Sequence, residues 1–340
     1  MAATSTGHPA LRWDGARLQI LDQTLLPAQE VWIDLHGAAD TAAAIRALRV
    51  RGAPLIGIAA AYGLALEVAR GTPGEDLEAA ARDLREARPT AVNLARAVDC
   101  VLAAVAAARD GDRATAALAA ARALHADEDA ASAAIALAGA DLLRGTRRLL
   151  THCNAGALAT GGEGSALAIA AELARRGELT VIAGETRPLL QGARLTVWEL
   201  ARGGIDHELI VDAAGPGLIR RGLVDAVVVG CDRVAANGDV ANKVGTYPLA
   251  LAAAAAGIAF VVAGPTSSID AALASGEQIE IEERSGDEVR MHAGFTTTLP
   301  ATRVRNPAFD ITPAALVTAL VTERGVARPV DATSVAELVR

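Results

Sequence analysis

Between residues 147 and 265 the chain alternates short apolar segments with helical ones, and this alternation restricts the fold more than any other feature. The apolar segments, rich in branched residues, are RRLLTHCN, LTVIAGE, HELIVDA, AVVVGCD and IAFVVAGP. Strands separated by helices pair in parallel and form an open sheet with helices on both faces. The sequence therefore predicts an α/β fold with a doubly wound, mainly parallel sheet.

The residues before this region have a different pattern. Short strand-like segments come first, and from Asp40 to about Leu143 the apolar residues recur at helical spacing. Within this stretch we expect one helix to end at His125 and another to begin at Asp127. The division of the chain is therefore expected to be a mostly helical N-terminal domain at 1–144 and an α/β catalytic domain at 145–340.

The last part of the chain gives weaker signals. Residues 279–298 are charged and extended, with few indications of a helix. Thr312–Pro313 marks the start of a helix that we expect to end at Gly325, because proline is favoured in a first helical turn.

Composition and charge argue against several classes of function. The net charge of −8 disfavours a nucleic-acid surface. Charged residues interrupt the alanine-rich runs, so none of these runs predicts a membrane span, and the N-terminus lacks the pattern of a signal peptide. The three cysteines have neither disulfide-framework nor metal-ligand spacing, which indicates a cytoplasmic protein with reduced thiols.

Polar side chains follow the apolar segment that ends at Val229. Asp232 comes three residues later, and the loop beyond it carries Asn242 and Lys243. Open α/β sheets bind ligands at the carboxyl ends of their strands, and these groups suit a phosphorylated, hydroxyl-rich ligand. Asn, Asp and Gly are also common turn residues, so this loop alone leaves a purely structural role open.

Two other predicted strands end in polar residues. Cys153 follows the first strand, and Glu185 and Thr186 follow the second, with Gln191 just beyond. A cysteine at this edge is a candidate nucleophile or proton carrier if its pKa is lowered, although a lone cysteine is more often buried and inert. Polar clusters at several strand ends on one expected edge favour a binding site.

In the helical region, Arg51 and Arg88 each precede the start of a helix. Arg51 is followed by Gly52 and Ala53, and helix-start amides beside an arginine form an anion site. The alternative is an arginine beside an ordinary helix break. The glycines at 161–164 lack the third member of a dinucleotide fingerprint, so no nicotinamide or flavin site is expected.

Taken together, these segments resemble the methylthioribose-1-phosphate isomerase family. The resemblance spans almost the whole chain in order, through WDGARLQILDQTLLP (13–27), RGAPLIGIAAAYG (51–63), RPTAVNL (88–94), THCNAGALAT (151–160), ETRPLLQGARLT (185–196), GCDRVAANGDVANKVGTYPLA (230–250), AGPTSSID (263–270) and NPAFDITP (306–313). It implies a helical N-terminal domain, a Rossmann-like C-terminal domain and a homodimer. The expected reaction, without metal or organic cofactor, converts 5-methylthioribose 1-phosphate into 5-methylthioribulose 1-phosphate in methionine salvage.

The resemblance also assigns roles to residues, motif by motif. It implies that Cys153 and Asp232 are the catalytic pair. The implied substrate-binding positions are Arg51, Gly52, Ala53, Arg88, Gln191, Asn242 and Lys243. Cys231 departs from the pattern, because alanine is expected there, and it adds a second thiol beside the catalytic acid.

Two kinds of relative share the expected fold. Isomerases of 5-deoxyribose 1-phosphate or ribose 1,5-bisphosphate would use the same acid and thiol. Regulatory subunits of the translation-initiation exchange factor are binding proteins. Both Cys153 and Asp232 are present in this chain, together with the arginines, which argues against the second kind.

Overall fold

A computed structural model describes residues 9–15, 17–88, 91–292 and 294–340, which form two compact units. One unit contains the residues up to Ala133 together with Ala155–Gly164, and the other contains Ala134–Asn154 and Ser165–Arg340. The change of unit falls inside helix α5 (Arg113–Leu142). The domain division expected at residue 145 stays a prediction.

The first unit is mostly helical. Its described residues up to Leu35 form an antiparallel sheet of β1 (Leu11–Trp13), β2 (Leu18–Leu21) and β3 (Trp32–Leu35). The helices are α1 (Ala38–Arg46), α2 (Ala53–Ala69), α3 (Gly74–Glu86), α4 (Val92–Ala107), the first part of α5 and α6 (Ala157–Thr160). Helix α2 is apolar on every side and is buried from Leu55 to Ala65, so it forms the centre of this unit.

Among its described residues, the second unit contains a seven-stranded sheet. Its order is β16-β15-β10-β7-β4-β5-β6. The strands are β4 (Arg148–Thr151), β5 (Thr180–Gly184), β6 (Asp206–Ile210), β7 (Ala226–Val229), β10 (Ala259–Ala263), β15 (Ala319–Thr322) and β16 (Gly325–Ala327). All neighbouring pairs are parallel except β15 with β16, which confirms the predicted fold class.

Two of the predicted helix assignments are wrong. The helix expected from Pro313 to Gly325 is a short 3-10 turn followed by β15, because Ala319–Thr322 is fully buried and pairs with β10. The burial of both sheet faces favours a strand here over the helix that the proline suggests. The break expected between His125 and Asp127 is also absent, since the described helix α5 continues through both residues.

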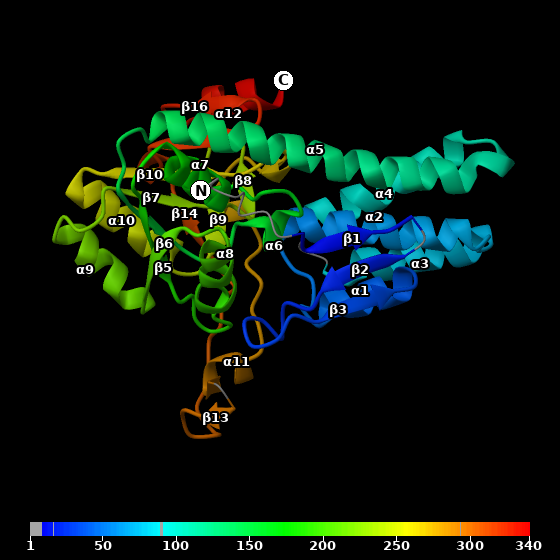
Figure 1. Cartoon of the computed structure of the whole chain (residues 1–340), viewed down its shortest axis with the longest axis horizontal. Coiled ribbons are helices and arrows are strands. Elements are labelled where there is room, and N and C mark those ends of the chain that lie inside the picture. Colours follow the sequence, from blue (N-terminus) through cyan, green and yellow to red (C-terminus); the bar gives the residue numbers. More distant parts are fainter. Residues whose placement is uncertain (1–8, 16, 89–90, 293) are drawn as a thin grey trace. The chain divides into compact units, whose positions relative to one another are not determined.

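Helices cover both faces of the large sheet. From β4 the chain runs outward to β5 and β6 through α7 (Ala166–Arg176) and α8 (Val197–Arg202), and then returns to β7 and β10 through α9 (Gly215–Arg220) and α10 (Thr246–Ala256). Right-handed crossovers in opposite directions place the two pairs of helices on opposite faces, as Figure 1 shows for α7 against α9 and α10. The direction reverses between β4 and β7, so ligands are expected at the carboxyl ends of these two strands.

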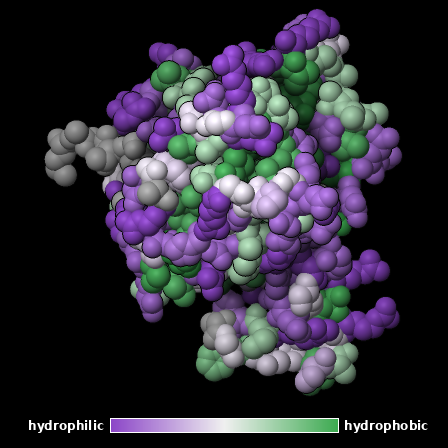
Figure 2. All heavy atoms as spheres, turned by 90° about the vertical axis from the view of Figure 1, so that its right-hand side faces the viewer, coloured by the Kyte–Doolittle hydropathy of each residue, from purple (hydrophilic) through white to green (hydrophobic). Residues whose placement is uncertain are grey.

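A smaller sheet follows β7. It contains the described strands β11 (Ile269–Asp270), β8 (Arg233–Ala235), β9 (Val240–Lys243) and β14 (Phe309–Thr312), in that order. Between β11 and β14 the chain forms a projecting segment with α11 (Asp287–Arg290), β12 (Met291–His292) and β13 (Phe295–Thr296). This segment is the lower lobe in Figure 2, where hydrophilic and hydrophobic residues mix. Helix α12 (Ala332–Val339) ends the chain.

Within the part of the chain that the structure describes, none of the helices is both long enough and apolar enough to cross a membrane.

Candidate functional site

Cys153 lies two residues beyond the end of β4, in an unusual backbone conformation. Its φ of 62° is in the left-handed region, which non-glycine residues rarely adopt. The backbone is held there from both sides: Cys153 N donates to Thr186 Oγ1 at 2.8 Å, and its carbonyl accepts from Thr196 Oγ1 at 2.6 Å. Backbone strain of this kind concentrates at functional sites, where the surrounding structure enforces it.

The segment after β5 supplies these two threonines. Thr186 itself has a φ of 66°, and Gly192 begins a π-helix (Gly192–Thr196). A Cβ on Gly192 would overlap the Gly184 carbonyl oxygen, so glycine allows this close approach. Gln191 is buried, and its Oε1 has no hydrogen-bond partner among the described residues. A buried, unsatisfied acceptor is costly, which marks Gln191 as a candidate ligand-binding residue.

Asp232 lies three residues beyond the end of β7, at the start of the β8–β9 hairpin. Its backbone N donates to Ala241 O at 2.9 Å, and the next residue pairs with Ala241, which places Asp232 opposite Asn242. Because β4 and β7 are neighbours, Cys153 and Asp232 both follow the two strands at which the sheet order reverses. This is where open α/β sheets bind ligands.

Asn242 and Lys243 are fixed by the end of the hairpin. Asn242 Nδ2 donates to Thr246 Oγ1 at 3.0 Å. The Lys243 ammonium donates to Ala308 O at 2.8 Å and lies 4.4 Å from the centre of the Phe309 ring. A carbonyl and an aromatic face together hold the cation at a defined place.

The thiol of Cys231, next to Asp232 in sequence, has a raised pKa. Burial, reinforced by the charge of Asp232, raises the pKa of the Cys231 thiol to about 12. A Cβ on Gly264 would overlap the Cys231 sulfur, so glycine makes room for it. Since the thiolate is the reactive form, Cys231 is neutral and unreactive near pH 7.

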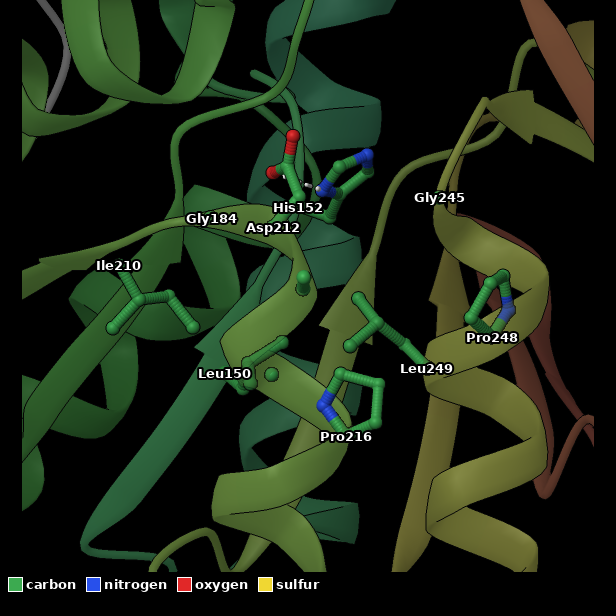
Figure 3. Close-up of a pocket in the computed structure, with 11 residues that line it drawn as sticks. Leu150, His152, Gly184, Ile210, Asp212, Pro216, Gly245, Pro248 and Leu249 are labelled. Carbon is green, nitrogen blue, oxygen red and sulfur yellow. Dashed lines mark ion pairs between the residues drawn. The ribbon is translucent and has the colours of Figure 1, made fainter.

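His152, the sequence neighbour of Cys153, lines a pocket of about 190 Å³ with mostly apolar walls. Its Nε2 lies 2.8 Å from Val244 O, and its Nδ1 lies 3.7 Å from Asp212 Oδ1. Figure 3 shows these two side chains together above Leu150 and Pro216. Burial lowers the pKa of His152, although the carbonyl and the carboxylate oppose this effect, so the imidazole is neutral at pH 7.

Asp212 connects this pocket to the cysteine. Its two carboxylate oxygens accept from the backbone N of Thr186 at 2.8 Å and of Arg187 at 2.7 Å. Thr186 in turn accepts from Cys153 N. The sequence placed Thr186 among the polar residues after the second strand and did not identify Asp212, because neither contact leaves a signal in local sequence.

In the other unit, Arg51, Gly52 and Ala53 lie at the start of α2. Gly52 has a φ of 96°, and a Cβ on it would overlap the backbone of Ala159, so this position requires glycine. Arg51 Nε donates to Gln23 Oε1 at 3.1 Å, and Gln23 is a residue that the sequence did not single out. The guanidinium and the first-turn amides of α2 are the groups that bind anions at helix starts.

Arg88 is half-buried and lies between α3 and α4, in the same unit. Its carbonyl accepts from Ala91 N at 3.0 Å. Pro89 and Thr90, which belong to the same sequence motif, lie outside the described residues. The predicted site residues therefore divide between the units: Arg51, Gly52, Ala53 and Arg88 in one, and Cys153, Gln191, Asp232, Asn242 and Lys243 in the other.

Comparisons with known proteins agree with one another. The model of the Initiation factor 2 subunit family matches residues 49–329. A methylthioribose-1-phosphate isomerase of Anaeromyxobacter sp. (strain K) is 52% identical over 329 residues, which are 96% of each chain. Another, of Alcanivorax borkumensis, is 48% identical and covers 95% of this chain and 94% of its own.

Solved structures give the same picture of the fold. The 5-methylthioribose 1-phosphate isomerase from Pyrococcus horikoshii OT3 superposes with a TM-score of 0.92 at 35% identity, over 100% of this chain and 98% of its own. A structure named translation initiation factor eIF-2B, subunit delta, from A. fulgidus has a TM-score of 0.84 at 37% identity, over 97% of this chain and 100% of its own.

Proposed function

The chain belongs to the methylthioribose-1-phosphate isomerase family and is an isomerase, and from that premise we propose that it converts 5-methylthio-D-ribose 1-phosphate into 5-methylthio-D-ribulose 1-phosphate in L-methionine salvage. One observation supports this most: an acid and a thiol, Asp232 and Cys153, follow adjacent strands at the point where the sheet order reverses.

The substrate poses a particular chemical problem. Its phosphate on C1 locks the sugar as a closed acetal, so the ring must open before hydrogen can move from C2 to C1. Ring opening breaks the bond between C1 and the ring oxygen, and that oxygen needs a proton. The transfer then needs either a base that forms an enediolate or a shielded path for hydride.

In our proposal Asp232 is protonated when the substrate is bound, and it is the acid that gives its proton to the ring oxygen. Cys153 either removes the C2 proton as a thiolate and returns it to C1, or stabilises the transition state of a hydride shift from C2 to C1. In both routes the proton of the C2 hydroxyl passes to the Asp232 carboxylate as the ketone forms. Both routes fit a thiol that its backbone holds in one place.

The remaining residues bind the substrate. The buried Oε1 of Gln191 accepts from a sugar hydroxyl, and Asn242 and Lys243 contact the sugar and its oxygens. Arg51, with the Gly52 and Ala53 amides, and Arg88 bind the phosphate dianion, for which arginine is suited. We further propose a homodimer in the cytoplasm that works without a metal ion or an organic cofactor, as the family resemblance implies.

The proposed reaction is tested by following purified protein and 5-methylthioribose 1-phosphate by NMR, with a chelator present. The wild-type protein is expected to form the ketose 1-phosphate. Asp232→Asn is expected to lower kcat by about 10²-fold or more, the scale of a lost acid-base group, with an unchanged circular-dichroism spectrum. Normal turnover in this variant contradicts the role of Asp232.

The same assay separates the alternatives. Conversion of only 5-deoxyribose 1-phosphate or ribose 1,5-bisphosphate would assign a sister isomerase with the same catalytic pair. Failure with all three substrates would favour a binding protein. The similarity to a structure named as an initiation-factor subunit is the observation that supports this alternative.

A further inference from the structure

Gln23 is a buried glutamine that makes two directional contacts beside the start of α2. It lies just after β2, and only 1% of its surface is exposed, which is rare for glutamine. Its backbone N donates to Arg49 O at 2.9 Å. Its side chain donates from Nε2 to Leu158 O at 2.8 Å and accepts at Oε1 from Arg51 Nε at 3.1 Å.

These two contacts require a carboxamide. The Arg51 N–H can only donate and the Leu158 carbonyl can only accept, so only a group with an acceptor on one side and a donor on the other satisfies both. Methionine has a similar length but would leave both partners without this bond. Glutamate would keep the acceptor for Arg51 but would place a second acceptor against the carbonyl.

The Gln23 carboxamide links Arg51 to helix α6, the same helix against which Gly52 packs. Leu158 belongs to α6, and Gly52 packs closely against the next residue of that helix, Ala159. Arg51, Gln23 and α6 therefore form one hydrogen-bonded row within a single unit. An arginine side chain loses rotamer entropy when it binds a ligand, and a fixed Nε removes part of that loss in advance.

We propose that Gln23 is a positioning residue for the phosphate subsite, which holds the Arg51 guanidinium in the orientation that receives the substrate phosphate. This inference rests on the proposed function, in which Arg51 binds that phosphate. Gln23 acts through Arg51 and touches no reacting atom. Its loss therefore weakens binding of the phosphate group more than it slows the chemical step.

A double-mutant cycle on the full chain tests the coupling, with inorganic phosphate as the probe and calorimetry as the measurement. Gln23→Met is expected to weaken phosphate binding by about tenfold. Arg51→Ala is expected to weaken it by at least as much. The double variant should be no weaker than Arg51→Ala by more than about twofold, because Gln23 has nothing left to position.

The kinetic readout separates positioning from a general loss of structure. With 5-methylthioribose 1-phosphate, Gln23→Met is expected to raise KM by about tenfold and to lower kcat by less than about threefold. The matched control is Gln19→Met in the same unit, since Gln19 Nε2 donates to Asp34 at 2.6 Å and bonds to a different partner. This control should leave KM and phosphate affinity unchanged.

The outcomes distinguish the inference from the function on which it rests. Unchanged phosphate affinity in Gln23→Met, or additive losses in the double variant, overturn the role of Gln23 while Arg51 keeps its own. Unchanged affinity in Arg51→Ala removes the phosphate role of Arg51 and the inference with it. No conversion by the wild type, with the phosphate cycle intact, contradicts only the proposed reaction.

A second variant covers the case in which Gln23→Met does not fold. Gln23→Glu keeps the shape of the side chain and is expected to weaken phosphate binding at least as much, because its carboxylate competes with phosphate for the Arg51 guanidinium. Phosphate affinity equal to that of the wild type in Gln23→Glu overturns the proposal.

Discussion

Two cysteines belong to the strand-end segments of the proposed site, and their surroundings differ. Cys153 is held in a left-handed backbone conformation by two threonines. Cys231 is half-buried with its sulfur beside Gly264, and desolvation raises the pKa of its thiol to about 12. Only the thiolate attacks electrophiles, so the raised pKa of Cys231 protects this thiol from alkylation even though it is adjacent to Asp232 in sequence.

This difference predicts the outcome of alkylation. In a Cys100→Ser background at pH 7.5, Cys231 is expected to react with iodoacetamide at least about 10²-fold more slowly in the native protein than in urea, where its pKa returns to about 8.5. Peptide mass spectrometry over a time course measures both rates. Equal rates at Cys231 in the native and unfolded states would show that its burial does not protect it.

At the scale of the elements, left-handed residues and carboxylate–amide hydrogen bonds fix the segments after β5 and β7. The segment after β5 turns through left-handed residues at Thr186 and Leu190, and Asp212 binds two of its amides. The hairpin after β7 ends at the start of α10, where Asp310 of β14 accepts from Gly245 N at 2.7 Å and from Tyr247 N at 3.1 Å. Each element boundary therefore depends on a specific small or acidic residue.

Gly192→Ala tests the approach after β5. Its Cβ would overlap the Gly184 carbonyl, which is backbone and cannot move aside easily, so the variant is expected to lose about 3 kcal/mol of unfolding free energy. Gly217→Ala in α9 is the matched control, because its Cβ would meet no described atom within 4 Å apart from its chain neighbours and the backbone of its own helix. It is expected to gain about 0.5–1 kcal/mol. Urea denaturation of both variants measures these changes, and similar midpoints would contradict the close approach.

Asp310 gives the hairpin end a pH dependence. Burial raises its pKa to about 6, although backbone amides and Lys243 oppose this. Between pH 4 and 6 the folded state therefore keeps a proton on Asp310 that the unfolded state has released. The contribution of this proton to the unfolding free energy is complete below pH 4 and is lost as pH rises through 6. Relative to Asp310→Asn, the wild type is expected to lose on the order of 2 kcal/mol over this range. Thermal unfolding of both proteins from pH 4 to 7 measures it, and parallel profiles would refute the shift.

At the scale of the whole molecule, the core is built with few aromatic residues. Aromatic residues make up 2% of the chain, and the sheet core consists of valine, leucine, isoleucine and alanine packed around Phe260. Strands buried on both faces read as continuous apolar runs, which is why β7 was predictable from Val227–Val229 alone. Residues 319–322 form an equally buried strand, but the proline before them suggested a helix, and only pairing with β10 decides between the two.

The large sheet should depend strongly on Phe260, the aromatic residue in its core cluster. Phe260→Ala is expected to cost about 3–5 kcal/mol, since the small, branched neighbours cannot collapse into the space of a ring. Phe295→Ala is the control, because Phe295 is 76% exposed, and it should change stability by less than about 0.5 kcal/mol. Chemical denaturation compares them, and a small cost for Phe260→Ala would mean that the core repacks.

The positions of the two proposed catalytic residues in the fold were predictable, because both follow strands. Cys153 and Asp232 follow apolar runs, and sheet topology brings such positions to one edge. Gln23 and Asp212 were not predictable, because what they do depends on contacts with segments distant in the chain: Gln23 reaches Leu158, 135 positions away. Local sequence shows which groups are reactive, whereas the residues that hold them in place are defined only by the folded chain.

The chain path between the units has a consequence for how this protein can be divided. Ala155–Gly164 leaves the α/β unit just after Cys153 and Asn154, completes the surroundings of Gly52 and Gln23, and then returns to the unit that it left. A fragment that stops at residue 144 would lack helix α6, which Gln23 and Gly52, on either side of Arg51, contact. A cut at residue 144 therefore does not yield an intact helical unit, and expression of that unit by itself needs Ala155–Gly164 as well.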